Sequence, residues 1–289
     1  MTTDDAAASP TVGFVGLGNI GSAMAKRLLD WPGGLVVHDL RAEAVAPFVE
    51  AGAREAADLD ELAAAATVIS VVVLDDAQVR DVVGRLAAVA APGTVVAIHS
   101  TIEVDTAPAL AAAAAARDVH VLDAPVSGGA MGAAEGRLAV MVGGERAAYE
   151  RVKPPFGTWA ELILHVGPAG AGTATKLARN LLTFAGYAAA AESQRLAEAA
   201  GVDLQKLAAI VRHSDGITGG PSAIMVRDRT AALAANDPLR PIFEHTRGLG
   251  EKDLALALSL GATLGVDLPF TRLALDALAA GLGVPDEEK

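Results

Sequence analysis

Short runs of apolar, mostly β-branched residues alternate with longer Ala- and Leu-rich stretches along the first half of the chain. Such alternation predicts strand-helix-strand crossovers, and therefore a parallel sheet. Because the runs are apolar throughout, both faces of the sheet should be covered by helices. The pattern thus predicts an α/β fold with a doubly wound parallel sheet. The expected strands are residues 12–15, 35–37, 67–73, 94–98, 119–122, 138–142 and 162–166.

The second half of the chain is predicted to be all-helical. Strand patterns stop after residue 166, and a Gly- and Pro-rich stretch follows before one long helical pattern. We therefore expect a disordered tail at 1–10, a dinucleotide-binding domain at 11–166 and an all-α domain for substrate binding and oligomerisation at 167–289. Asp203 is a candidate helix cap, and residues 216–221 form a candidate Gly-rich bend. The expected helices cover residues 173–200, 248–264 and 270–282, with a further one beginning near residue 203.

Composition and charge exclude several classes of protein. The 289 residues carry a formal net charge of −12, without a basic stripe that would attract nucleic acid or anionic lipid. The apolar runs are shorter than the ~20 residues that span a bilayer. Because the chain has no Cys and its six His residues are dispersed, we expect no disulfide and no metal site. Asp4 and Asp5 stand where a signal peptide would carry positive charge, which favours a cytoplasmic protein.

A glycine motif indicates a dinucleotide cofactor. The residues Gly16, Leu17, Gly18, Asn19, Ile20 and Gly21 follow the first predicted strand and open a helix. Glycines there permit a tight turn, close approach of the backbone to a pyrophosphate, and close packing of helix on strand. The helix N-terminus then faces the phosphates. The motif has the context of a Rossmann-type fold.

Asp39 is the candidate ligand for the ribose hydroxyls. It ends the second predicted strand, 18 residues beyond Gly21, close to the usual spacing of about 20. A carboxylate there favours NAD, although Arg41 offers a cation to the extra phosphate and leaves NADP possible. The alternative is a solvated turn residue.

The segment 123–129 is a candidate anion site. It ends a predicted strand, where open α/β sheets place their ligands. The backbone N–H groups of Gly128 and Gly129, together with the hydroxyl of Ser127, suit a substrate carboxylate. The alternative, which the spacing alone favours, is an ordinary tight turn.

Lys176 is the candidate acid-base group. It lies one helical turn before Asn180, so both side chains leave the same face. Partial burial of such a lysine lowers its pKa toward the range useful for proton transfer. The alternative is a surface lysine lying over its Leu neighbours.

These motifs together resemble the β-hydroxyacid dehydrogenase family. The likeness covers the whole chain in four segments: the cofactor signature from Gly13, the substrate segment 123–144, the helix containing Gly170 to Asn180, and the motif Lys252-Asp253-Leu254. The resemblance implies a Rossmann domain followed by a helical domain, and assembly as dimers or tetramers. The implied reaction is reversible hydride transfer between a nicotinamide and a small β-hydroxy acid.

The resemblance also implies roles for individual residues. Lys176 would be the catalytic lysine, and Asn180 would hold the lysine and the substrate oxygen. The substrate carboxylate would bind to Ser127, Gly128 and Gly129. The remaining expected cofactor contacts are Leu74, Thr101 and Lys252.

This chain departs from the family pattern in two places. Asp75 replaces a usual Pro, which leaves open the shape of the loop that follows Leu74. His245 and Arg247 precede Lys252 where many relatives carry Phe at the first position. They are interpreted either as cations that admit a larger acid or as a solvated helix start.

Two rival functions remain at this stage. Imine reductases resemble this fold but typically have Asp or Tyr in place of Lys176 and prefer NADPH, which Asp39 disfavours. A non-catalytic nucleotide-binding module would need the glycine turn, but neither Lys176 nor the segment Ser127 to Gly129.

Overall fold

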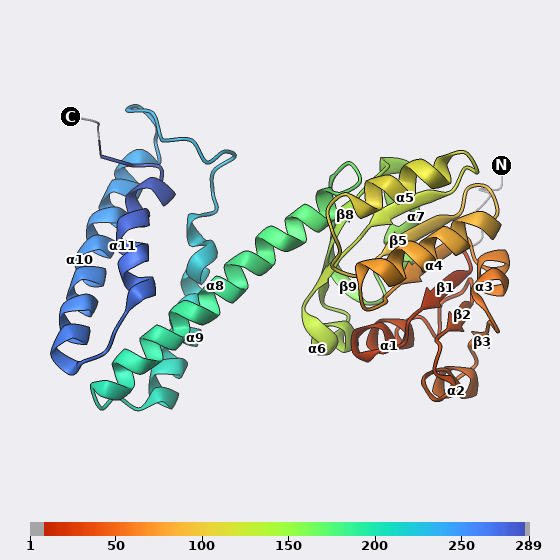
Figure 1. Cartoon of the computed structure of the whole chain (residues 1–289), viewed down its shortest axis with the longest axis horizontal. Coiled ribbons are helices and arrows are strands. Elements are labelled where there is room, and N and C mark those ends of the chain that lie inside the picture. The colour runs from red at the N-terminus through yellow and green to blue at the C-terminus, as the bar shows by residue number, and fades with distance from the viewer. Residues whose placement is uncertain (1–8, 287–289) are drawn as a thin grey trace, which may run out of the picture. The chain divides into compact units, whose positions relative to one another are not determined.

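The computed structural model describes residues 9–286, so most of the expected tail at 1–10 lies outside the described residues. The chain divides into two compact units, Met1–Arg179 and Asn180–Lys289. Figure 1 shows the sheet in the first unit and helices in the second. Among the described residues, no helix combines the length and the apolarity needed to cross a membrane.

The first unit contains a sheet in which the order of the described strands is β3-β2-β1-β4-β5-β6-β8-β7, with β9 paired to β8. Strands β1 to β6 pair in parallel, whereas β8 runs antiparallel to β6 and β7. The predicted strands are confirmed with small shifts of their ends, and two strands of two residues each, β3 and β7, were not predicted. The strands are β1 (Val12–Val15), β2 (Leu35–His38), β3 (Arg54–Glu55), β4 (Val68–Val71), β5 (Val95–Ile98), β6 (His120–Asp123), β7 (Val126–Ser127), β8 (Leu138–Gly143) and β9 (Ala160–Gly167).

Two apolar cores cover the two faces of this sheet. In β5, Ala97 belongs to one core and Ile98 to the other, because successive side chains point to opposite faces. The first core is closed by α1, α2, α6 and α7, and the second by α3, α4 and α5. The doubly wound fold is therefore confirmed. The helices are α1 (Asn19–Lys26), α2 (Ala42–Glu50), α3 (Leu59–Ala65), α4 (Asp76–Val89), α5 (Thr106–Ala115), α6 (Gly129–Glu135) and α7 (Arg146–Phe156).

The remaining helices include the long α8, which begins in the first unit and continues into the second. Asp203 caps α9 by accepting hydrogen bonds from the N–H groups of Gln205 and Lys206, at 2.8 and 3.2 Å. In the expected bend at 216–221, α9 continues to Thr218 before Gly219 ends it with φ of +85°. The elements are α8 (Ala171–Ala199), α9 (Leu204–Thr218), the 3₁₀ helix η1 (Gly220–Ile224), α10 (Arg240–Leu264) and α11 (Pro269–Gly281).

Helix α10 begins earlier than the sequence pattern predicts. It starts at Arg240 rather than at residue 248, with Pro241 in its first turn, where a missing N–H costs nothing. Ion pairs one turn apart, such as that between Arg240 and Glu244 at 2.7 Å, support the added turns. The interpretation of His245 and Arg247 as a helix start is therefore wrong, because both lie inside α10.

A buried histidine, His99, joins the central strands β4, β5 and β6 near their carboxyl ends. His99 follows β5, and its Nδ1 lies 2.7 Å from the carbonyl oxygen of Ala124, which can only accept a hydrogen bond. Nδ1 therefore carries the proton, and Nε2 accepts from the hydroxyl of Ser70 at 3.1 Å. The rings of Phe156 and Trp159 contact the imidazole edge to face. Burial lowers the pKa of His99 to about 4, although the bond to Ala124 opposes this shift.

We predict that acid destabilises the fold through His99. An unfolded histidine binds its proton near pH 6.5 and the folded one only near pH 4, so the unfolded state holds more protons between these values. The free energy of unfolding should therefore fall by about 3 kcal/mol as the pH drops through this window. Urea unfolding between pH 4 and 7 gives the slope of the free energy of unfolding against pH for the wild type and for His99→Gln. The difference between these two slopes measures the contribution of His99. Equal slopes, or an NMR titration of His99 near pH 6.5, would contradict the prediction.

Candidate active site

The turn between β1 and α1 is shaped by its glycines. Gly16 has φ of +92°, and a Cβ there would collide with the carbonyl oxygen of Val72. At Gly21 a Cβ would collide with the carbonyl oxygen of Gly16. Around Gly18, by contrast, no atom lies within 4 Å of the position of a Cβ. Close packing thus requires two of the glycines, whereas the third leaves an opening through which a phosphate can reach the backbone.

A groove of about 650 Å³ lies over this turn, within the size range of small-molecule sites. It brings together several predicted cofactor residues, whereas the partly buried Ile20 packs against the core. The sequence interpretation missed Ser22 and Lys26, although their spacing of one helical turn in α1 was a signal for a shared face. Lining residues of this groove include Leu17, Gly18, Asn19, Ser22, Lys26 and Arg41.

The carboxylate of Asp39 is tied to the glycine turn. Its Oδ2 accepts a hydrogen bond from the N–H of Leu17 at 2.7 Å, and its Oδ1 accepts from the N–H of Arg41 at 2.9 Å. The guanidinium of Arg41 lies 3.2 Å away and is mostly exposed. Burial opposes ionisation of Asp39, but the N–H groups of Arg41 and Leu17 and the guanidinium outweigh it and lower the pKa. The side chain is thus held as an anion beside the groove.

The loops after β4 and β5, which carry Leu74 and Thr101, are joined by a hydroxyl. Ser100 donates a hydrogen bond from Oγ to the carbonyl of Val73 at 2.6 Å and accepts one from the N–H of Val73 at 3.1 Å. Leu74 and Thr101 are both exposed. The two loops therefore hold a common position at the carboxyl edge of the sheet.

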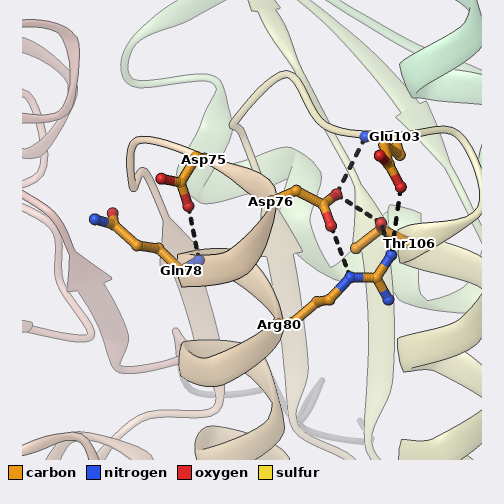
Figure 2. Close-up of polar contacts among 6 residues, drawn as sticks. All are labelled: Asp75, Asp76, Gln78, Arg80, Glu103 and Thr106. Carbon is orange, nitrogen blue, oxygen red and sulfur yellow. Dashed lines mark hydrogen bonds and ion pairs between the residues drawn. The ribbon is translucent and has the colours of Figure 1, made fainter.

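A second connection between these loops involves Asp76 at the start of α4 (Figure 2). Its Oδ1 accepts hydrogen bonds from the hydroxyl of Thr106 at 2.6 Å and from the N–H of Glu103 at 3.2 Å. Its Oδ2 accepts from Nε of Arg80 at 2.6 Å, and Arg80 also donates to Thr106. The carboxylate thus joins the starts of α4 and α5.

Asp75 caps α4. Its Oδ1 accepts a hydrogen bond from the N–H of Gln78 at 2.9 Å, as Figure 2 shows. The side chain of Gln78 in turn accepts a hydrogen bond from the N–H of Leu74 at 3.0 Å. A capped helix start therefore supports the loop that carries Leu74.

The candidate carboxylate site is a tight turn between β7 and α6. Gly128 and Gly129 have φ of +130° and +66°, a region that disfavours other residues. A Cβ on Gly128 would lie 2.8 Å from the side chain of Leu138, whereas nothing lies within 4 Å of one on Gly129. Both glycines are exposed and Ser127 is half-buried, so their N–H groups and its hydroxyl are within reach of a ligand.

The side chain of Lys176 contacts Val126, the residue that precedes this turn. Its Nζ donates a hydrogen bond to the carbonyl of Val126 at 2.7 Å. Burial lowers the pKa of the half-buried lysine, and the nearby charge of Arg179 lowers it further. Asn180 is half-buried one turn later on α8. The structure thus brings Lys176 into contact with Val126, the residue before Ser127, which sequence spacing did not predict.

The remaining predicted residues lie on α10. Lys252 is exposed, and its Nζ lies 3.2 Å from Oδ1 of Asp253. Arg247 donates hydrogen bonds to Glu251 at 2.6 Å, to the carbonyl of Val284 at 2.9 Å and to Asp286 at 2.6 Å. Arg247 therefore holds the C-terminal segment against α10.

Comparison with known proteins finds a family model for each half of the chain. A family model described as the NAD binding domain of 6-phosphogluconate dehydrogenase matches residues 11–167, and one described as NAD-binding of NADP-dependent 3-hydroxyisobutyrate dehydrogenase matches residues 170–286. The chain is 60% identical over 280 residues to an uncharacterized oxidoreductase of Mycobacterium tuberculosis, covering 96% of this chain and 95% of that protein.

Two further relatives have more specific names. The NAD-dependent L-serine dehydrogenase of Pseudomonas aeruginosa is 36% identical over 270 residues, covering 91% of this chain and 89% of that protein. A solved structure of Mycobacterium tuberculosis 3-hydroxyisobutyrate dehydrogenase with L-serine is 32% identical and has a TM-score of 0.67, covering 93% and 92% of the two chains. The chain therefore belongs to the β-hydroxyacid dehydrogenase family and is an NAD(P)-dependent oxidoreductase acting on hydroxyl groups.

Proposed function

We propose that this enzyme interconverts a small β-hydroxy acid and its semialdehyde or keto acid. The observation that carries the proposal is the contact of the half-buried Lys176 with Val126, directly before the turn Ser127 to Gly129. An amine and a set of anion-binding N–H groups at such close quarters suit a substrate that has a hydroxyl near a carboxylate. L-Serine and 3-hydroxyisobutyrate, which appear in the names of two relatives, are both acids of this class.

The proposed chemistry assigns a role to each polar group. Neutral Lys176 accepts the hydroxyl proton during oxidation and, as the ammonium, returns it during reduction. Its lowered pKa increases the neutral fraction at physiological pH. Asn180 orients the reacting oxygen, while Ser127, Gly128 and Gly129 bind the carboxylate. Holding the substrate at both ends keeps the reacting carbon in a fixed orientation.

The proposed cofactor site occupies the groove over the glycine turn. When bound, the nicotinamide accepts or donates the hydride. The glycine turn meets the pyrophosphate, and the loops joined by Ser100 and Asp76 support the nicotinamide end. The proposed cofactor-binding residues are Gly16, Leu17, Gly18, Asn19, Ile20, Gly21, Asp39, Arg41, Leu74, Thr101 and Lys252.

We further propose the organisation that the sequence pattern predicts. The dinucleotide-binding domain spans residues 11–166, and an all-α domain for substrate binding and oligomerisation spans residues 167–289. The acidic composition and the absence of Cys support a cytoplasmic location.

We propose a preference for NAD over NADP. The ionised Asp39 repels a 2′-phosphate, and Arg41, the adjacent cation, is already paired with that carboxylate. NADP would therefore have to break this ion pair in order to use Arg41.

Replacing Asp39 with Asn is expected to raise the ratio of kcat/KM for NADP to that for NAD by about tenfold, a change of roughly 1.4 kcal/mol. The substitution removes the negative charge and releases Arg41 while keeping one oxygen for the N–H of Leu17. Glu43→Gln is the matched control because Glu43 lines the same groove. A ratio that stays constant in Asp39→Asn, or that rises equally in both variants, would contradict the proposed preference.

Turnover is expected to depend on Lys176. The wild type should be assayed for oxidation of L-serine and 3-hydroxyisobutyrate and for reduction of cyclic imines. We expect it to oxidise the β-hydroxy acids. Lys176→Met should then lower kcat by about 10² to 10⁴ because proton transfer is lost, with NADH affinity retained by fluorescence titration. Lys206→Met, at an exposed site on α9, controls for loss of a lysine.

Two results of this assay would refute the proposed chemistry. One is a kcat of Lys176→Met within about threefold of the wild type, a far smaller loss than removal of an acid-base group causes. The other is turnover of imines alone with NADPH alone, which would favour the imine reductase alternative.

We also propose that two copies of the chain associate through the helices of the second unit. Neither α9 nor α11 has a buried residue, and the buried apolar cluster of this unit consists of only four residues, Leu233, Phe243, Leu282 and Val284. Apolar side chains of this size are normally covered, and a second copy offers the same apolar faces in return. Exposed members include Leu181, Phe184, Tyr187, Ile210, Ile217, Leu256 and Leu273.

Sedimentation is expected to show a dimer or a tetramer at micromolar concentration. Phe184→Asp should shift it toward monomer because a charge in the covered face must lose its water. Val49→Asp, at an exposed apolar site on α2, should leave the mass unchanged. A monomeric wild type would refute the proposed association.

A further inference from the structure

Asp123 at the end of β6 is a fully buried carboxylate with backbone partners. Its Oδ1 accepts a hydrogen bond from the N–H of Gly170 at 2.8 Å, and its Oδ2 accepts one from the N–H of Thr173 at 2.6 Å. A buried charge is costly unless hydrogen bonds replace its water, and two N–H groups provide such bonds here. Gly170 is the residue before α8, and Thr173 lies in its first turn.

These bonds make Asp123 a remote cap for α8. The first N–H groups of a helix have no partner within it and carry a partial positive charge. Gly170 immediately precedes the helix and has no side chain to accept from them. The carboxylate that does so comes from 47 and 50 residues earlier in the chain.

Glycines permit the close approach of the helix to the sheet. A Cβ on Gly172 would collide with the carbonyl oxygens of Met141 and Asp123. One on Gly143 would collide with Oδ1 of Asp123. The first turn of α8 is therefore packed against the backbones of β6 and β8, with no space for a side chain between them.

The segment that caps α8 also accepts a hydrogen bond from Lys176 of that helix. Lys176 follows Thr173 by about one helical turn, and its Nζ donates to the carbonyl of Val126, which follows Asp123 by three residues. Two contacts thus join α8 to the segment 123–127, one at the first turn of the helix and one at the lysine. The proposed carboxylate site, which begins at Ser127, is the continuation of that segment.

We propose that Asp123 is a positioning residue that sets the place of Lys176 relative to the carboxylate site. It acts by fixing the first turn of α8 and touches neither substrate nor cofactor. The inference rests on the proposed function for its kinetic consequence, whereas its effect on the lysine itself does not depend on turnover.

Asp123→Asn tests this role with little change of shape. The amide presents an NH₂ group to one of the two N–H donors, so one hydrogen bond to α8 is lost. We expect kcat to fall by about ten- to a hundredfold because the lysine shifts relative to the substrate, with the Kd for NADH within about twofold. Since the site is buried, a lower Tm is also expected.

Glu192→Gln is the matched control for this loss of stability. Glu192 is also a buried carboxylate that caps another helix. It accepts hydrogen bonds from the N–H groups of Phe270 and Thr271, at 2.7 and 2.9 Å, where α11 begins. It should show a comparable fall in Tm with kcat close to that of the wild type. Equal loss of kcat in Asp123→Asn and Glu192→Gln would overturn the positioning role.

A second readout follows Lys176 directly. The rate of acetylation of Lys176, measured by peptide mass spectrometry as a function of pH in the enzyme without substrate, reports the pKa of its amine. In the wild type the midpoint should lie below the ordinary 10.5, since burial disfavours the ammonium. In Asp123→Asn it should rise toward that value because the displaced amine gains water, whereas loss of the Asp123 charge alone would lower it. In Glu192→Gln it should not move.

The two readouts separate the inference from the proposed function. If the wild type turned over no hydroxy acid while the midpoint rose in Asp123→Asn alone, the proposed reaction would be wrong and the positioning of Lys176 would stand. If the midpoint in Asp123→Asn matched that in the wild type or fell below it, the positioning role would be overturned whatever the kinetics showed.

Discussion

The hydrogen bonds between the carboxylate of Asp123 and the first turn of α8 are the constraint on which the arrangement of the candidate site depends. They place a long helix at one point of a sheet, so that Lys176 reaches the carbonyl of Val126. Because Val126 and Ser127 continue the chain from Asp123, one short segment carries the cap, the partner of the lysine and the proposed start of the carboxylate site. Movement at any of these points would therefore be transmitted to the others.

The cofactor side of the first unit is held by the same kind of interaction, a hydrogen bond between a side chain and the backbone of another segment. The carboxyl ends of parallel strands meet at one edge of a sheet, and polar groups there are bonded to backbone atoms of neighbouring loops. Asp39 accepts from the glycine turn, Ser100 bonds the backbone of Val73, and His99 beneath them bonds the carbonyl of Ala124. Satisfied polar groups of this kind keep exposed loops in place, because breaking any one of the bonds would leave a buried atom without a partner.

The sequence predicts the parts of the fold that follow from local pattern. The continuous apolar runs of β1, β4 and β5 predict buried parallel strands, and Asp203 predicts the start of α9 because an N-cap acts within three residues. Strands β3 and β7, of two residues each, are too short to produce a pattern. The start of α10 was missed because its support comes from ion pairs and Pro241 rather than from apolar spacing.

The candidate site shows the same limit. The glycine turn and Asp39 are recognisable because their spacing is local, and Lys176 and Ser127 are recognisable as separate motifs. Their proximity is not, because it depends on contacts between residues about 50 positions apart. The capping role of Asp123 and the loop connection through Asp76 were missed for the same reason, since the partners that make these connections are 27 or more residues away.

A crystal structure of the enzyme with NAD and a bound β-hydroxy acid such as L-serine would test the central claim most directly. The proposed chemistry predicts the carboxylate on the hydroxyl of Ser127 and the N–H groups of Gly128 and Gly129. It also predicts the β-hydroxyl within hydrogen-bonding distance of Nζ of Lys176, at about 2.6 to 3.2 Å. A carboxylate bound elsewhere, with Lys176 directed away from the hydroxyl, would contradict it.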